Sequence, residues 1–125
     1  MIDARELRIG NIVYFNNYEQ LDIDQIKTLT FIDFEQICYD KHANRFSPIQ
    51  LTKEILEKWC GFEKIDFDYF ELKAEKNYYC HIDELGFGFA LEHETFYICE
   101  YVHELQNLYF ALTGEELKVN YEKNI

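Results

Sequence analysis

The sequence predicts a single α+β domain, because it has 125 residues, strand-like alternation along most of its length, and two helical patterns. Residues 1–46 are expected to form a small β-meander or partial barrel. Residues 48–125 are expected to form a short helix, antiparallel strands and a C-terminal helix that packs on the sheet. One proline and five glycines leave no flexible linker between these two subregions of the domain.

The N-terminal subregion is predicted to consist of short strands. Gly10-Asn11 is typical of a turn that enters a strand over 12–15. Apolar and acidic residues alternate over 21–25, and β-branched and aromatic residues fill 28–34, so each stretch indicates a strand. Residues 36–39 have the composition of a further strand.

Two helices are predicted from their caps and from the spacing of apolar residues. Thr52 is a favoured N-cap for a helix over 53–60, because its hydroxyl can accept a hydrogen bond from the first turn. Gly61 is the expected stop of this helix. A second helix is predicted to begin at Val102, where apolar residues recur every three or four positions, and to end at Gly114.

Strand periodicity returns between the helices and after the second one. Alternation predicts strands over 65–69, 78–83, 85–91, 95–101 and, last, 117–121. The run over 85–91 carries bulky residues on one face and only glycine and alanine on the other. We therefore expect a neighbouring element to pack closely against the bare face.

The charge of the chain indicates the kind of partner it can bind. There are 24 acidic and 12 basic residues, a net charge of −12, and no Lys or Arg stands between Lys76 and Lys118. Such a surface repels phosphate backbones, so we expect no direct binding of DNA or RNA by the C-terminal half. A basic protein surface is the expected partner, and a solvated face that only aids solubility is the alternative. The candidate partner contacts are Asp83, Glu84, Glu92, Glu94, Glu100, Glu104, Glu115 and Glu116.

No catalytic residue, metal site or cofactor is predicted. The four cysteines are Cys38, Cys60, Cys80 and Cys99, and they are expected to be free, mostly buried thiols. Cys80, Cys99 and His93 could approach one another across a hairpin, but they lack the spacing of a zinc site. Cys99, His103 and Asn107 could form a Cys-His-Asn relay, which would require an exposed thiol.

Nothing in the sequence indicates a membrane or a secretory route. No apolar run approaches the ~20 residues of a membrane-spanning helix. The N-terminal residues lack the basic segment and apolar stretch of a signal peptide. We therefore expect the protein to lie in the cytoplasm.

Three segments of the chain resemble a known set of proteins. They are Glu6-Leu-Arg-Ile-Gly-Asn11, the stretch PIQLTKEILEKWCGF over 48–62 and the stretch HELQNLYFALTGEEL over 103–117. They are similar to segments of small uncharacterised proteins of bacterial mobile elements and phages. The resemblance implies a mobile-element origin and a shared fold, and it transfers no reaction. Gln106 and Asn107 are polar in the middle of the second helix, where they could satisfy buried strand ends or face a partner.

The leading hypothesis from the sequence is a non-enzymatic inhibitor carried by a phage or prophage. It would bind a basic surface of a host nucleic-acid-handling protein, an RNA-guided nuclease above all, as anti-CRISPR proteins do. Glu92, Glu94, Glu100 and Glu104 are its expected contacts. Two alternatives stay open: a structural or assembly accessory protein of a phage, and a small enzyme that depends on the Cys99 and His103 region.

Overall fold

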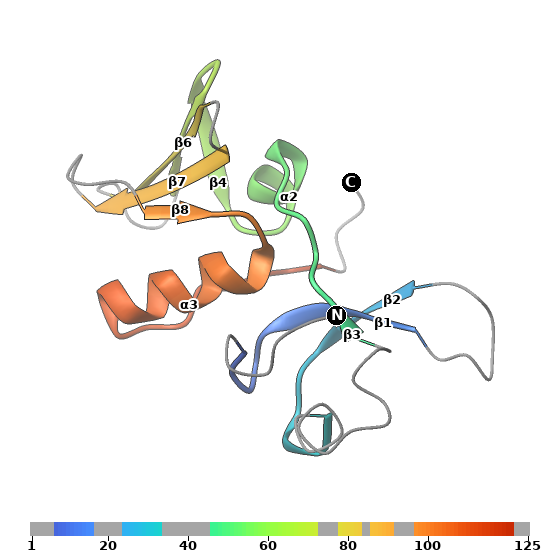
Figure 1. The fold of residues 1–125 in the computed structure, drawn as a ribbon. Helices are drawn as coiled ribbons and strands as arrows, with labels where there is room; N and C mark the ends of the chain where they lie inside the picture. Colours follow the sequence, from blue (N-terminus) through green and yellow to red (C-terminus); the bar gives the residue numbers. More distant parts are fainter. Residues whose placement is uncertain are drawn as a thin grey trace.

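The computed structural model has the predicted α+β class, with a C-terminal helix that packs on the sheet. The residues it describes are 7–16, 24–33, 46–72, 78–83, 86–91 and 97–121. A three-stranded and a five-stranded antiparallel sheet are present. Helix α3, Val102–Thr113, lies between them (Figure 1). It contacts β1 of the smaller sheet and β7 and β8 of the larger one.

The N-terminal sheet has its first strand in the centre. Its strand order is β2-β1-β3, formed by β1 (Ile12–Asn16), β2 (Asp24–Thr28) and β3 (Phe46–Ser47). In a meander β3 would pair with β2, so this part of the prediction is corrected. The side chains of β1 agree with this central place. Ile12 and Val13 point to opposite faces of the sheet, and both are buried, Ile12 in the main core cluster and Val13 in the smaller one.

The predicted strand over 28–34 is wrong beyond Thr28. β2 ends at that residue, and residues 31–33 are helical. The Thr30 amide donates to Asp33 Oδ2 at 3.0 Å, and the Asp33 amide donates to Thr30 Oγ1 at 3.3 Å. This reciprocal capping starts a helical turn and outweighs the β-propensity of the two apolar residues between them. The strand predicted over 36–39 lies outside the described residues.

The five-stranded sheet is antiparallel throughout and has the strand order β4-β5-β6-β7-β8. The predictions over 78–83, 85–91 and 95–101 are confirmed in this sheet for the described residues, except that the last strand ends at Cys99. Its strands are β4 (Phe62–Asp66), β5 (Tyr69–Leu72), β6 (Tyr78–Asp83), β7 (Gly86–Leu91) and β8 (Tyr97–Cys99).

The predicted strand over 65–69 is wrong, because a hairpin turn at Phe67 and Asp68 divides it between β4 and β5. The pairing shifts register between Lys64 and Asp66, and Asp66 Oδ1 accepts a hydrogen bond from the Phe67 amide at 2.7 Å. Aspartate is a common turn residue, but Asp66 and Asp68 also fit the polar positions of an alternating strand.

The strand predicted over 117–121 is also wrong. Leu117 is buried and Val119 packs against the core, so the alternation reflects real burial. No strand is assigned to these described residues, however. Instead, the Asn120 amide donates to the Trp59 carbonyl at 2.9 Å, which ties this extended segment to the end of helix α2.

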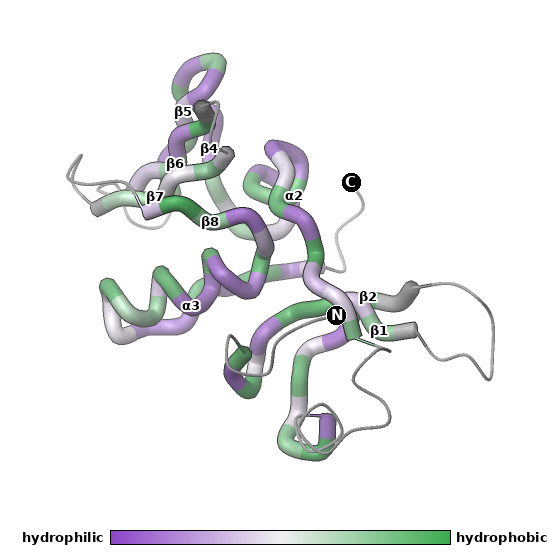
Figure 2. Tube along the Cα trace, viewed as in Figure 1, coloured by the Kyte–Doolittle hydropathy of each residue, from purple (hydrophilic) through white to green (hydrophobic). Residues whose placement is uncertain are grey.

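Both predicted helices are present, with the predicted caps at Thr52 and Gly114, whereas α2 has its C-cap at Trp59 and not at Gly61. Helix α2 spans Lys53–Lys58, two residues shorter than expected, and Thr52 Oγ1 accepts from the Ile55 amide at 3.1 Å. Helix α3 ends at Gly114, whose φ of 77° lies in the left-handed region that favours glycine. Hydrophilic and hydrophobic residues alternate along α3, as expected for a helix with one buried face (Figure 2).

The main core fills the space enclosed by α2, α3 and the inner face of the five-stranded sheet. Phe62, Phe70 and Phe89 from the sheet are fully buried there with Leu56 of α2 and Leu105 of α3. A second, smaller cluster belongs to the N-terminal subregion and comprises Leu7, Val13, Leu29 and Phe46. Helix α3 touches both sheets and so connects the two parts of the chain.

Candidate functional site

The structure separates the acidic residues that the sequence marked as partner contacts. Glu84, Glu92 and Glu94 lie outside the described residues, and the backbone of Asp83 pairs with Gly86 at the end of β6. Glu100 and Glu104 lie together at the N-terminus of α3, whereas Glu115 and Glu116 follow its C-terminus. A helix of twelve residues is about 18 Å long, so these two pairs lie at opposite ends of α3.

Two of these acidic side chains stabilise the fold. Glu104 Oε1 accepts hydrogen bonds from the amides of Glu100 at 2.8 Å and Tyr101 at 2.9 Å, which caps the start of α3. Glu116 forms an ion pair with Arg8 at 2.5 Å. Both carboxylates therefore have partners within the fold, although Glu116 is exposed, as Glu100 and Glu115 are.

Arg8 brings a positive charge to residues 77–117, the stretch of the chain that contains no Lys or Arg. Its Nε donates to Asn107 Oδ1 at 2.7 Å, and its guanidinium group donates to both carboxylate oxygens of Glu116. The same group lies over the Phe110 ring, 4.5 Å from its centroid. The stretch without Lys or Arg is thus partly neutralised in space, by a residue about a hundred positions away in the sequence.

Of the two polar residues in the middle of α3, Gln106 satisfies backbone groups at a strand end and Asn107 binds side chains of the N-terminal subregion. Gln106 Oε1 accepts from the Ile12 amide at 2.9 Å, and Gln106 Nε2 donates to the Gly10 carbonyl at 3.3 Å. Asn107 Oδ1 accepts from the Asn11 side chain at 2.8 Å as well as from Arg8. Of the two roles that the sequence left open, the structure supports the first.

The three segments that carry the resemblance meet around α3. Residues 6–11 reach it through Arg8 and Asn11, as described above. The segment over 48–62 joins it through backbone hydrogen bonds, from the Val102 amide to the Ile49 carbonyl and from the Leu51 amide to the Glu100 carbonyl, each 2.9 Å long. These motifs therefore contribute to the internal frame of the fold.

The thiol chemistry required by the enzyme alternative is absent from the described cysteines. Cys60, Cys80 and Cys99 are free and buried. Burial raises the pKa of Cys60 to about 12, and burial together with the Glu104 carboxylate raises the pKa of Cys99 to about 12. Burial likewise raises the pKa of Cys80 well above its usual range. Thiols of such high pKa carry almost no thiolate, the reactive form, at neutral pH.

The histidine and asparagine of the supposed Cys-His-Asn relay make other contacts. His103 is buried and stacks on the Tyr101 ring at 5.8 Å with an interplanar angle of 7°. Asn107 is bound to Arg8 and Asn11, as given above. In the described part of the chain, no three His, Cys, Asp or Glu side chains gather as a metal ion would require. His93 and Cys38 lie outside that part.

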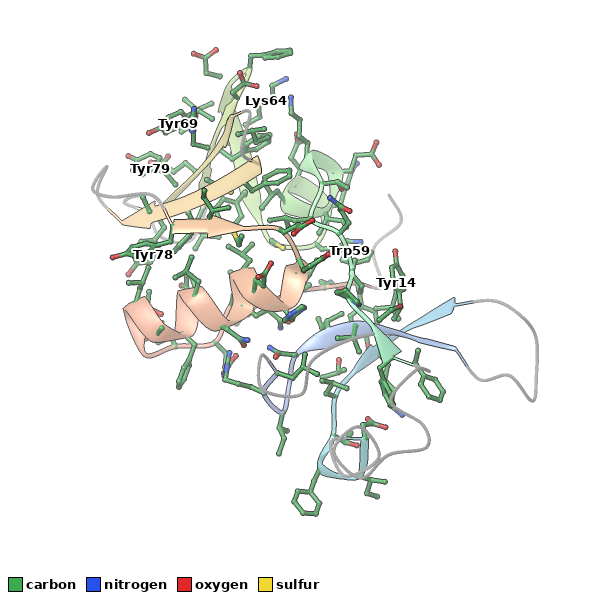
Figure 3. All side chains as sticks on the ribbon, viewed as in Figure 1. Tyr14, Trp59, Lys64, Tyr69, Tyr78 and Tyr79 are labelled. Carbon is green, nitrogen blue, oxygen red and sulfur yellow. The ribbon has the colours of Figure 1, made fainter. Side chains whose placement is uncertain are left out.

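One surface of the five-stranded sheet faces away from both helices. Paired residues share a face, so the register places one set of side chains opposite the main core. We call this surface the outer sheet face, and its described side chains are Glu63, Asp66, Tyr69, Glu71, Tyr79, His81 and Ile98. Figure 3 shows Tyr69 and Tyr79 on the side of the sheet away from α2, with Tyr78 toward α3. Tyr78 packs edge-on against Tyr109 of that helix at 5.6 Å.

Three rings form the centre of the outer sheet face. Tyr69 is paired with His81, with ring centroids 5.4 Å apart, and it contacts Tyr79 edge-on at 5.8 Å. On β7, Gly88 pairs with His81 and Ala90 pairs with Tyr79. The bare face predicted for this strand therefore belongs to the outer sheet face, and its glycine and alanine are buried beside these two rings.

Carboxylates border the rings. Glu63 of β4 and Glu71 of β5 are direct cross-strand partners, and Asp66 pairs with Tyr69 one step further along the hairpin. Desolvation, and next the hydrogen bond to the Glu71 carboxylate, raise the pKa of the Tyr79 hydroxyl. The sequence analysis missed this site, because Glu63, Asp66 and Glu71 are brought together by a turn in a stretch that the sequence analysis interpreted as a continuous strand.

Comparisons of the chain with protein-family models, with curated proteins and with solved structures found no match. The resemblance to proteins of mobile elements therefore stays a prediction. Neither helix among the described residues has the length and apolar character needed to cross a membrane.

Proposed function

We propose that the protein is a non-enzymatic, acidic inhibitor that acts by binding a basic surface of another protein. Its target would be a nucleic-acid-handling protein of a bacterial defence system, specifically an RNA-guided nuclease, so that it acts as an anti-CRISPR protein. Such a target places it in the cytoplasm of the host bacterium. The choice of a nuclease as the target is based on the resemblance to proteins of mobile elements and phages. The choice of a basic surface is based on the net negative charge of the chain.

The observation that carries the proposal is the uncompensated negative charge. The chain has a net charge of −12, and Arg8, the cation that reaches the base-free part in space, is already bound to Glu116. Nucleases hold their substrates in positively charged channels. An acidic domain can therefore be attracted to such a channel and exclude the nucleic acid from it.

A pull-down with the tagged full chain tests this proposal. The bait is exposed to lysates of cells that each express one candidate RNA-guided nuclease, and captured nuclease is eluted with increasing salt. We expect capture at low ionic strength, loss of binding as salt rises, and inhibited cleavage of target DNA in the purified complex. Capture of no nucleic-acid-handling protein, or binding that is independent of salt, contradicts the proposal.

Size-exclusion chromatography separates this function from that of a phage assembly protein. The inhibitor is expected to elute as a monomer across a wide range of concentration. Concentration-dependent growth into larger species would instead favour the accessory role, because such proteins act by self-association.

A further inference from the structure

We draw no further inference here: the strongest candidate, the surface patch at the tip of the β4–β5 hairpin with the exposed side chains of Ile65 and Phe67, is apolar, and nothing in the described part of the structure shows what covers it.

Discussion

Gln106, in the middle of α3, accepts a hydrogen bond from the backbone amide of Ile12 at 2.9 Å, at the first residue of β1. Both residues are buried, and the same side chain donates to the Gly10 carbonyl. A helix residue thereby satisfies the start of a strand that lies 94 positions earlier in the chain. This contact fixes the N-terminal sheet on the rest of the domain.

Replacing Gln106 by leucine should therefore destabilise the whole protein. The Ile12 amide would be left buried without its acceptor, which costs about 1–3 kcal/mol. Urea unfolding followed by the fluorescence of Trp59, the only tryptophan of the chain, measures the change. Glu115→Gln, on an exposed residue near the end of the same helix, is the control and should stay within about 0.5 kcal/mol of the native value. A Gln106→Leu variant as stable as that control would contradict the role given to this side chain.

The Arg8 side chain should contribute more to stability than its ion pair alone. An exposed pair such as Arg8 and Glu116 is worth about 0.2–1 kcal/mol, so Glu116→Gln is expected to have a small effect. Arg8→Ala also removes the hydrogen bond to Asn107 and the contact with Phe110, and it should cost about 1–3 kcal/mol.

A double-mutant cycle on Arg8 and Glu116 checks this division. The coupling energy is expected to be about 0.5–1 kcal/mol and to shrink as salt is added, because it reports the ion pair alone. A coupling as large as the whole effect of Arg8→Ala would show that the neutral contacts contribute nothing.

The N-terminal subregion should lose stability in acid through Asp33. Burial alone would raise the pKa of this carboxyl, but hydrogen bonds from Lys27 and Thr30 outweigh burial and lower the pKa below its usual 3.8. The Lys27 ammonium lies 2.9 Å from Asp33 Oδ1. Because the folded pKa is depressed, the stabilisation is complete well above pH 3.8 and is lost as pH falls through the folded pKa.

The difference in unfolding free energy between the native chain and Asp33→Asn measures this contribution. It should be constant above about pH 5 and shrink below pH 3.8, where the unfolded chain takes up a proton first. In a Lys27→Met background the pH dependence of the difference should be weaker, since the ammonium group is gone. A difference that stays constant down to pH 2 would rule out the depressed pKa.

Local signals in the sequence predicted local structure well. Thr52 and Gly114 mark helix ends because a cap depends only on residues within one turn. The alternation over 78–83 marks β6 because one face of that strand is buried. The turn at Phe67 and Asp68 escaped prediction, since Asp66 and Asp68 also fit the polar positions of an alternating strand. The helical turn over 31–33 had a signal, the Thr30-x-x-Asp33 capping box, but the apolar residues inside it favoured a strand.

The site could not be predicted, because it depends on register and on long-range contacts. That Glu63 opposes Glu71 follows from the place of a turn and the register shift beside it. That Arg8 neutralises Glu116 follows from the packing of the N-terminal sheet on α3. Counting charges along the chain identified its acidic half. It also named Glu104 and Glu116 as partner contacts, whereas in the structure Glu104 caps α3 and Glu116 pairs with Arg8.

The thiols provide a decisive test of the enzyme alternative. With pKa values of about 12, Cys60 and Cys99 should be alkylated by iodoacetamide at pH 8 at least ~10³-fold more slowly than an exposed thiol, because so little thiolate is present. The assay is best done in a Cys38→Ser variant, so that every remaining thiol is one of the buried three. Mass spectrometry should find no modification in the native protein and three modified cysteines in concentrated guanidinium chloride. Rapid native alkylation at Cys99 would instead show an accessible, activated thiol and would favour catalysis over inhibition.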